Sequence, residues 1–299
     1  MRQPIADHLF FLPGRRGGRF PHCNSLLIED AGRAVMDPAS DAKELKALAE
    51  EGVQVVLLSH FHTDHIRDLK LFPKAAIYIH QADAPALRDF EEMIRFVWGH
   101  LADRSGNWGG RKLREVGEYG WTPARELKDG EELVIGSTRV QVVHTPGHTP
   151  GHSCFWFPEA QVLFAADMDL TEFGPWYGNA ASSVDDTLAS IEKLKQLRPR
   201  LTVTGHEVGM IEGDITDRLD AFARVIAERE ARILACLEEP LTHEELVRKG
   251  TIYGPHYSPD NLNHWMEWRM TWHHLRSLEA RGIIRQAEGK YLRATMVRA

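Results

Sequence analysis

Short apolar runs follow one another through the first two thirds of the chain, and segments with helical spacing separate several of them. The run Val53–Leu58 is rich in β-branched residues and predicts a buried strand. Further strands are predicted from the apolar runs at 9–12, 25–28, 34–36, 75–80, 163–166 and 200–204, and a hairpin from 132–143. Leucines at helical spacing predict helices near residues 45–48 and over 183–197. Alternating strands and helices are typical of a layered α/β domain.

After Gly213 the pattern becomes mostly helical. An amphipathic helix is predicted from Asp214 through Leu237, and Pro240 ends it. Three further elements are predicted: a short helix that starts with a capping box of Thr242 and Glu245, a helix over 270–281, and a hairpin over 283–292. We therefore expect two domains, 1–213 and 214–299.

Residues 84–126 differ in character from the segments around them. They carry three tryptophans, many charges and several glycines, including the run Gly106-Asn107-Trp108-Gly109-Gly110. We interpret this segment as an insertion that is helical over 87–100 and loop-like beyond.

Three histidines and an aspartate lie directly after the predicted strand Val53–Leu58. They are His60, His62, Asp64 and His65. Imidazole and carboxylate groups suit a divalent metal such as zinc, iron or manganese. Residues i and i+2 of extended backbone point the same way, so His60 and His62 can hold one ion. Asp64 and His65, just past the turn, would point to a neighbouring site.

Three later polar residues also follow apolar runs or turns. His148 lies in a Pro-Gly-His-Thr turn, Asp167 follows the run 163–166, and His206 follows the strand predicted over 200–204. Taken singly, each has an ordinary structural interpretation as a turn or strand-end residue. His152 is a rival to His148, and Asp169 is a rival to Asp167. We favour His148 and Asp167 because of their positions after the turn and the apolar run.

The pattern H-x-H-x-D-H at residues 60–65, with these later segments in the same order, resembles the signature of the metallo-β-lactamase superfamily. The resemblance covers roughly residues 5–210. It is nearest to the glyoxalase II and lactonase-like branches, because of the Pro-Gly-His-Thr run and the Gly-His-Glu segment at 205–207. It implies an α/β fold with four αββα layers, in which two sheets pack face to face with helices outside. One departure is that the aspartate strand ends in Ala166-Asp167, where the family usually has Gly-Asp.

The resemblance also implies a binuclear metal site. One ion would be bound by His60, His62 and His148, the other by Asp64, His65 and His206, and Asp167 would bridge them. The metal it implies is zinc, with iron or manganese as alternatives. A hydroxide held between the two ions would attack the carbonyl of a thioester, ester or lactone, as in a hydroxyacylglutathione hydrolase. Asp64 would orient this nucleophile and receive its proton.

The segment 173–179 follows Asp167 closely and is rich in aromatic residues. It could form a wall of the substrate pocket, with the Tyr177 hydroxyl as an oxyanion donor. The candidate substrate-binding residues are Phe173, Trp176, Tyr177, Asn179 and His256. A purely structural aromatic turn explains segment 173–179 equally well.

Composition and charge narrow the class of protein. Hydrophobic residues make up 43% and charged residues 26% of the chain, which is globular usage and argues against disorder. The net charge of −7 implies no general attraction to nucleic acid or to an anionic membrane. Three widely spaced cysteines without a C-x-x-C motif, and a start that lacks the long apolar stretch of a signal peptide, favour the cytoplasm. No apolar stretch reaches the roughly 18 residues of a membrane span.

The C-terminal segment leaves alternatives open. Helix, helix and hairpin resemble the winged helix appended to some lactamase-like hydrolases and endoribonucleases, so an endoribonuclease or phosphodiesterase using the same metal site is the alternative function. Residues 215–299 contain 13 Lys and Arg against 12 Asp and Glu, which argues against nucleic-acid binding. We expect Trp265, Trp268 and Trp272 to form one helical face that packs on the catalytic domain or on a second subunit of a homodimer. A binding protein with an inactive site is disfavoured by the intact ligand set.

Overall fold

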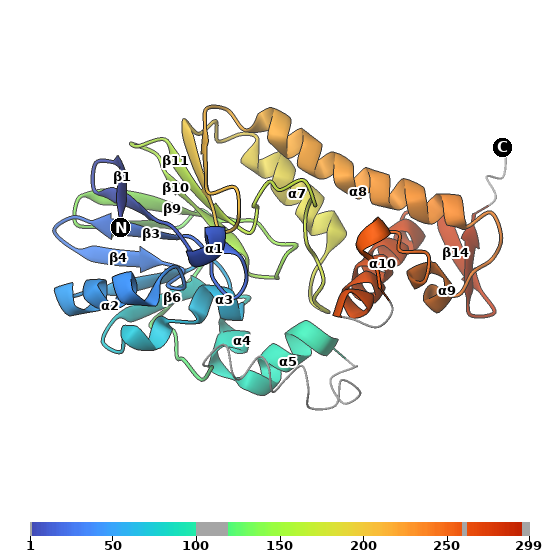
Figure 1. Ribbon diagram of the computed structural model, residues 1–299, viewed down its shortest axis with the longest axis horizontal. Coiled ribbons are helices and arrows are strands. Elements are labelled where there is room, and N and C mark those ends of the chain that lie inside the picture. Colours follow the sequence, from blue (N-terminus) through green and yellow to red (C-terminus); the bar gives the residue numbers. More distant parts are fainter. Residues whose placement is uncertain (1, 100–118, 259–261, 295–299) are drawn as a thin grey trace.

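Two β-sheets lie face to face at the centre of the larger part of the molecule (Figure 1). The computed structural model describes residues 2–99, 119–258 and 262–294. The first sheet contains, in spatial order, β1 (Gln3–Ala6), β2 (Leu9–Leu12), β3 (Ser25–Glu29), β4 (Arg33–Met36), β5 (Val55–Leu58), β6 (Ala76–His80) and β7 (Arg125–Leu127). Its first four strands are antiparallel, and β4 to β7 run parallel.

The second sheet is built from the middle of the chain. Its strands are β8 (Glu132–Ile135), β9 (Thr138–His144), β10 (Ser153–Phe157), β11 (Val162–Ala166), β12 (Leu201–Thr204) and β13 (Met210–Glu212), in the reverse spatial order β13 to β8. β11 and β12 are parallel, so Asp167 and His206 follow the same end of two neighbouring strands.

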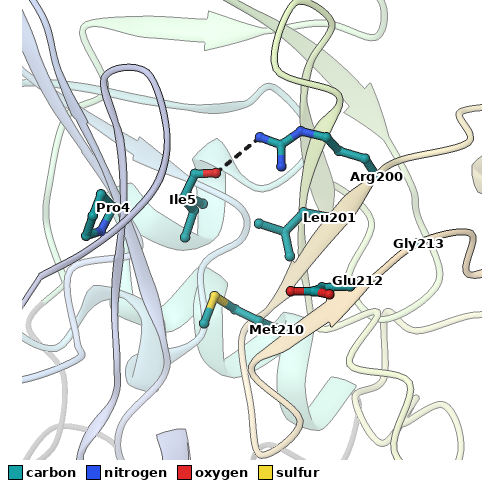
Figure 2. Close-up of a pocket in the computed structure, with 7 residues that line it drawn as sticks. All are labelled: Pro4, Ile5, Arg200, Leu201, Met210, Glu212 and Gly213. Carbon is teal, nitrogen blue, oxygen red and sulfur yellow. Dashed lines mark hydrogen bonds between the residues drawn. The ribbon is translucent and has the colours of Figure 1, made fainter.

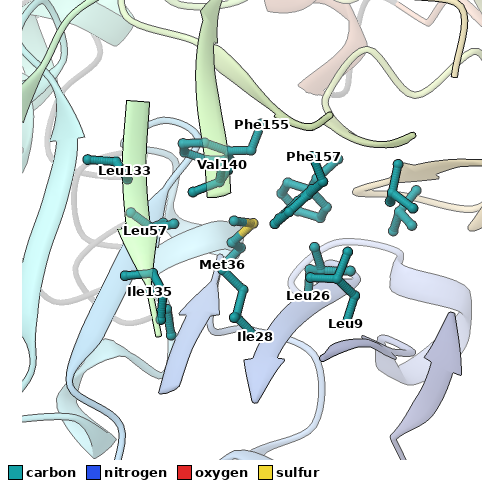
Figure 3. Close-up of a cluster of buried hydrophobic side chains, with 14 of the residues drawn as sticks. Leu9, Leu26, Ile28, Met36, Leu57, Leu133, Ile135, Val140, Phe155 and Phe157 are labelled. Atoms are coloured by element: carbon teal, nitrogen blue, oxygen red, sulfur yellow. The ribbon is translucent and has the colours of Figure 1, made fainter. Parts of the chain in front are cut away.

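An apolar core fills the space between the sheets (Figure 3). Strands of both sheets alternate in side-chain direction, so every second residue faces this core. The first sheet contributes Leu9, Leu26, Ile28, Met36 and Leu57, and the second contributes Leu133, Ile135, Val140, Phe155 and Phe157.

Helices cover the outer face of each sheet. The first sheet is covered by α2 (Ala42–Glu51), α3 (Thr63–Ile66), η1 (Leu69–Leu71), α4 (Ala84–Arg88) and α5 (Phe90–Trp98), with α1 (Arg15–Gly18) near the rim. The second is covered by α7 (Val184–Leu194) and the start of α8 (Thr216–Cys236). These are the four αββα layers that the resemblance implied, and that prediction is confirmed. Of the predicted insertion, α4 and α5 agree with the expected helix, and residues 100–118 lie outside the described residues.

The C-terminal segment forms a smaller lobe beside the sandwich (Figure 1). After α8 come α9 (His243–Val247), η3 (Gly254–His256), α10 (Leu262–Ala280), β14 (Ile284–Ala287) and β15 (Lys290–Arg293). The capping box is present, because the Thr242 hydroxyl accepts from Glu245 N and the Glu245 carboxylate accepts from Thr242 N. The last helix begins at Leu262 rather than at the predicted residue 270. Identity of this lobe as a winged helix stays a prediction.

Helix α8 contributes to three apolar cores. Leu219 and Phe222 pack with the outer layer of the second sheet, and Ile233 packs with Leu275 of α10 in the smaller lobe. Between them, Ile226 packs with Tyr177 and Met270. The helix begins at Thr216, and its N-cap residue is Ile215 rather than the predicted Asp214. The Asp214 carboxylate nevertheless accepts a hydrogen bond from Thr216 N. The expected boundary between 213 and 214 stays a prediction.

Candidate metal centre

The first group of candidate ligands gathers at the rim where β5, β9 and β11 end. His60, His62, His148 and Asp167 each offer a ligand atom, and these atoms all lie within 4.8 Å of one another. His148 Nε2 is 2.9 Å from His62 Nδ1 and 3.1 Å from Asp167 Oδ2. His60 and His62 lie two residues apart in the extended segment after β5, as the sequence predicted.

The second group lies beside the first. Asp64, His65 and His206 likewise offer ligand atoms within 4.8 Å of one another. His65 Nε2 is 3.1 Å from His206 Nε2, and His206 Nε2 is 3.6 Å from Asp64 Oδ2. Asp64 and His65 point here because α3 turns the chain directly after His62.

Asp167 lies between the two groups. Its Oδ2 is 3.1 Å from His148 Nε2 and 4.0 Å from His60 Nε2, while its Oδ1 is 2.9 Å from His65 Nε2 and 3.4 Å from His206 Nε2. One carboxylate oxygen therefore faces each group, which is the arrangement that a bridging ligand requires. Asp169 belongs to neither group, and its Oδ1 accepts from Thr171 N at 3.2 Å.

The side chains of both groups fit a pair of divalent cations. The buried His60 Nε2 has no hydrogen-bond partner among the described residues. Burying an unpaired polar atom costs free energy, and a cation bound at this lone pair would remove that cost. The Nδ1 atoms of His148 and His206 contact the carbonyls of Trp176 (2.9 Å) and Gly18 (2.5 Å). A carbonyl only accepts, so each Nδ1 donates to it and each Nε2 is the nitrogen that faces the site. Nitrogen and carboxylate donors are those that zinc, iron and manganese accept.

The charge states of the first group also suit a cation. Burial, followed by the neighbouring imidazoles, holds the pKa of His60 and of His62 well below the usual value. Burial alone would raise the pKa of Asp167, but His65 and His206 outweigh it and hold that pKa well below its usual range. Neutral imidazole and ionised carboxylate are the forms that bind metals.

Comparison with known proteins agrees with this geometry. Residues 18–206, more than half of the chain, match the family described as the metallo-beta-lactamase superfamily. The chain belongs to the metallo-β-lactamase superfamily. It is accordingly a metal-dependent hydrolase.

Two superfamily relatives carry activities in their names. A hydroxyacylglutathione hydrolase from Synechococcus sp. is 28% identical over 219 residues, which are 68% of this chain and 73% of the relative. An acyl-coenzyme A thioesterase from Homo sapiens is 25% identical over 197 residues, 64% of each chain.

Two solved superfamily structures match almost the whole chain. A metallo-beta-lactamase family protein from Thermus thermophilus aligns with a TM-score of 0.78 and 25% identity, covering 97% of this chain and 100% of its own. A beta-lactamase domain protein from Burkholderia ambifaria aligns with a TM-score of 0.75 and 19% identity, covering 98% and 93%. The alignment therefore extends over the C-terminal lobe as well as over the superfamily domain.

The buried carboxylate of Asp37 orients one of the candidate ligands, and the sequence analysis did not identify it. Asp37 directly follows β4, and its carboxylate accepts from Ser59 N (2.7 Å), Ser59 Oγ (2.6 Å) and His65 Nδ1 (2.8 Å). It thereby fixes which nitrogen of His65 faces the site. The sequence signal was an aspartate directly after the apolar run 34–36, at the end of the strand next to β5.

Neither His152 nor His144 belongs to the two ligand groups. His152 Nε2 accepts from Asp167 N at 3.2 Å, and its Nδ1 is 2.9 Å from Thr145 Oγ1. His144 stacks on His80 with ring centroids 3.8 Å apart, and its Nε2 donates to Pro150 O at 2.8 Å.

Two residues of the segment 173–179 contact the candidate ligands His62 and His148. The Trp176 ring is 5.4 Å from that of His148 and 6.0 Å from that of His62, between centroids. Asn179 is buried, and its Nδ2 lies 2.5 Å from His62 Nε2. With a proton on His62 Nε2, rotation of the amide presents its oxygen as acceptor and leaves Nδ1 free for the site.

The predicted oxyanion role of Tyr177 needs correction. Its side chain is fully buried, and its hydroxyl is 2.9 Å from Arg229 Nη1 and 2.7 Å from His274 Nε2. A hydroxyl held between two C-terminal helices cannot face a substrate at the metal ligands. Phe173 is 37% exposed and packs on the ring of Tyr253, and His256 is exposed in η3.

A separate groove lies away from these ligands (Figure 2). It has a volume of about 800 Å³ and opens where β1 approaches β12 and β13, at the opposite end of β12 from His206. Arg200 Nη2 donates to Ile5 O across it at 3.1 Å. None of the candidate ligands among the described residues lines this groove, so we assign it no part in the chemistry.

Proposed function

We propose that this protein hydrolyses a thioester, ester or lactone with two divalent cations held by the two ligand groups. The observation that carries the proposal is the place of Asp167, whose two oxygens each face a different group. Thioesters stand first because the names of the bacterial and human relatives describe hydrolysis of hydroxyacylglutathione and of acyl-coenzyme A.

The seven side chains named as ligands would hold the cations, and zinc is the first candidate. When bound, two such cations polarise a carbonyl and lower the pKa of water towards about 7, which makes a nucleophile available at neutral pH. The chain's own residues then have to position the acyl group and move a proton. No protein nucleophile is required.

Asp64 is the residue we propose for the proton. Its carboxylate is partly exposed at the rim, with Oδ2 3.6 Å from His206 Nε2. It can therefore orient a water at the site and receive its proton, as a general base does.

The substrate side of the site would be walled by Trp176, which lies against both His62 and His148. Phe173 and His256 are exposed and stay proposed contacts. Asn179 is assigned instead to His62, since its amide is already buried against that ring.

The arginine side chains of the C-terminal lobe agree better with a small-molecule substrate than with an RNA substrate. The Arg269 side chain is buried, with its guanidinium 5.2 Å from the ring centroids of Trp265 and Trp268. Arg281 is paired with Glu230. The buried Arg269 cannot contact a phosphate, and the charge of the exposed Arg281 is already neutralised by Glu230. No helix of the described residues is long and apolar enough to cross a membrane.

Metal-loaded protein should be assayed against thioesters, lactones, phosphodiesters and β-lactams in parallel. We expect thioester cleavage, measured as thiol release, to exceed the other activities. Phosphodiester cleavage as the dominant activity would instead support the nuclease alternative, and β-lactam cleavage as the dominant activity would also contradict the proposal.

A further inference from the structure

We infer that Arg229 and His273, in the two C-terminal helices, are positioning residues for the first ligand group alone. They hold the outer side of the loop 173–182, and the inner side of that loop fixes His62 and His148. The inference rests on the two-cation site of the proposed function, but it is independent of which acyl compound is cleaved.

The inner side of the loop makes three contacts with the first group. The Trp176 carbonyl accepts from His148 Nδ1 at 2.9 Å, and the Asn179 amide meets His62 Nε2 at 2.5 Å. Ser182 Oγ donates to the His148 carbonyl at 2.7 Å. These contacts set the ring orientation of both histidines.

The second group is oriented by other parts of the fold. His65 Nδ1 donates to Asp37, and His206 Nδ1 donates to the Gly18 carbonyl. Both partners belong to the N-terminal part of the chain. A change in the loop 173–182 should therefore reach one group and spare the other.

Arg229 holds the first half of the loop from α8. Its side chain is 1% exposed, and its Nη1 donates to Pro175 O at 2.6 Å and to Tyr177 Oη at 2.9 Å. Its Nη2 donates to Phe173 O at 2.6 Å. Without this guanidinium, three acceptors next to Trp176 would lose their donor in a buried place.

His273 holds the second half of the loop from α10. Its buried Nε2 donates to the backbone carbonyl of Asn179 at 2.7 Å. The backbone of Asn179 is thus tied to α10 while its side chain meets His62. The two helices therefore hold both ligand-contacting residues of the loop, together with α5, whose Val97 and Phe96 carbonyls accept from Ala180 N (2.9 Å) and Ala181 N (3.0 Å).

The loop also approaches α8 too closely to shift without cost. Gly174 has φ +81°, and a Cβ built there would lie 2.5 Å from Val225 Cγ1 of α8. Only a glycine permits this contact, so the backbone of the loop packs directly against the Val225 side chain of α8.

The test uses full-length protein that has been stripped with a chelator and titrated with Co²⁺, whose visible absorption reports each site separately. Reference titrations of His148→Ala and His206→Ala identify which absorption change belongs to which group. The test variants are Arg229→Met and His273→Leu, and His273→Gln restores a donor near the position of Nε2. The matched control is Ser277→Ala, which breaks another bond of α10, from Ser277 Oγ to Asp185 Oδ1 (2.6 Å), that does not involve the loop.

We expect Arg229→Met and His273→Leu to weaken Co²⁺ binding at the first group by about 10- to 100-fold, as loss of such supporting contacts does. Binding at the second group should be unchanged, His273→Gln should recover most of the loss, and Ser277→Ala should resemble the wild type. If Arg229→Met does not fold, the comparison of His273→Leu with His273→Gln decides the test. Equal weakening of both groups, or no weakening of either, would overturn the inference. A wild type that binds no Co²⁺ would instead contradict the two-cation site itself.

Discussion

His152 Nε2 accepts a hydrogen bond from the backbone N–H of Asp167 at 3.2 Å. This nitrogen is therefore engaged with the backbone, whereas His148 Nε2 faces Asp167 Oδ2 and His62. We predict that His148→Ala loses about one ion per chain, while His152→Ala keeps the metal content of the wild type. Elemental analysis of protein purified without chelator measures both, and the opposite pattern would mean that His152 is the ligand.

The proton-accepting role of Asp64 predicts a loss of turnover. Asp64→Asn preserves the shape of the side chain but removes its charge and its basicity. We expect kcat to fall by at least about 100-fold, the lower end of general-base contributions. Steady-state kinetics should be accompanied by metal analysis, because turnover equal to wild type at full metal content would remove Asp64 from the mechanism.

The C-terminal lobe should be inseparable from the hydrolase. Removing residues 214–299 removes Leu219 and Phe222, which cover the outer face of the second sheet, and also Arg229. We predict aggregation, or loss of activity on small substrates, measured by size-exclusion chromatography and thiol release. Salt-sensitive binding of single-stranded RNA by the intact protein, lost on this truncation, would favour the nuclease alternative instead.

Mild acid should destabilise the C-terminal lobe through His243. Burial lowers the pKa of His243 to about 4 in the folded protein, where its Nε2 donates to Trp268 O at 2.9 Å. Between pH 6.5 and 4 the unfolded chain binds a proton at this residue that the folded chain does not, so the free energy of unfolding falls as the pH falls. The slope for one such group is at most about 1.4 kcal/mol per pH unit.

Thermal unfolding of chelator-treated protein at pH 7 and pH 5 measures this effect without a contribution from metal loss. We expect His243→Gln to lose less stability over this interval than the wild type does. His8→Asn, at an exposed turn, is the control and should behave as the wild type. An equal loss in wild type and His243→Gln would exclude His243 as the source.

The seven candidate ligands could be located from the sequence because each follows a strand or turn that is itself visible there. His60, Asp167 and His206 lie one or two residues after β5, β11 and β12, and parallel neighbours deliver such residues to one edge. The αββα layers could be predicted for the same reason, through the resemblance that these residues carry.

Tyr177 shows where sequence reasoning was insufficient. An aromatic residue shortly after Asp167 is compatible with a pocket wall. Only the fold shows that Arg229, 52 positions later, donates a hydrogen bond to the Tyr177 hydroxyl. Asp37 was missed for a similar reason, because its partners Ser59 and His65 lie more than 20 positions away. Contacts that join distant segments leave no local pattern.

Short elements were also beyond the sequence pattern. The strands β7 and β13 contain only three residues each, too few to show an alternation. They form because a neighbouring strand supplies backbone hydrogen bonds.

Thiol release from a thioester, followed while chelator-treated protein is titrated with Zn²⁺, measures whether hydrolysis needs both cations. We expect no significant hydrolysis without metal and a rate that rises until about two ions are bound per chain. Asp167→Asn should not reach the wild-type rate at any Zn²⁺ concentration. A rate that is complete at one ion per chain, or thioester hydrolysis that is independent of metal, would contradict the proposed function.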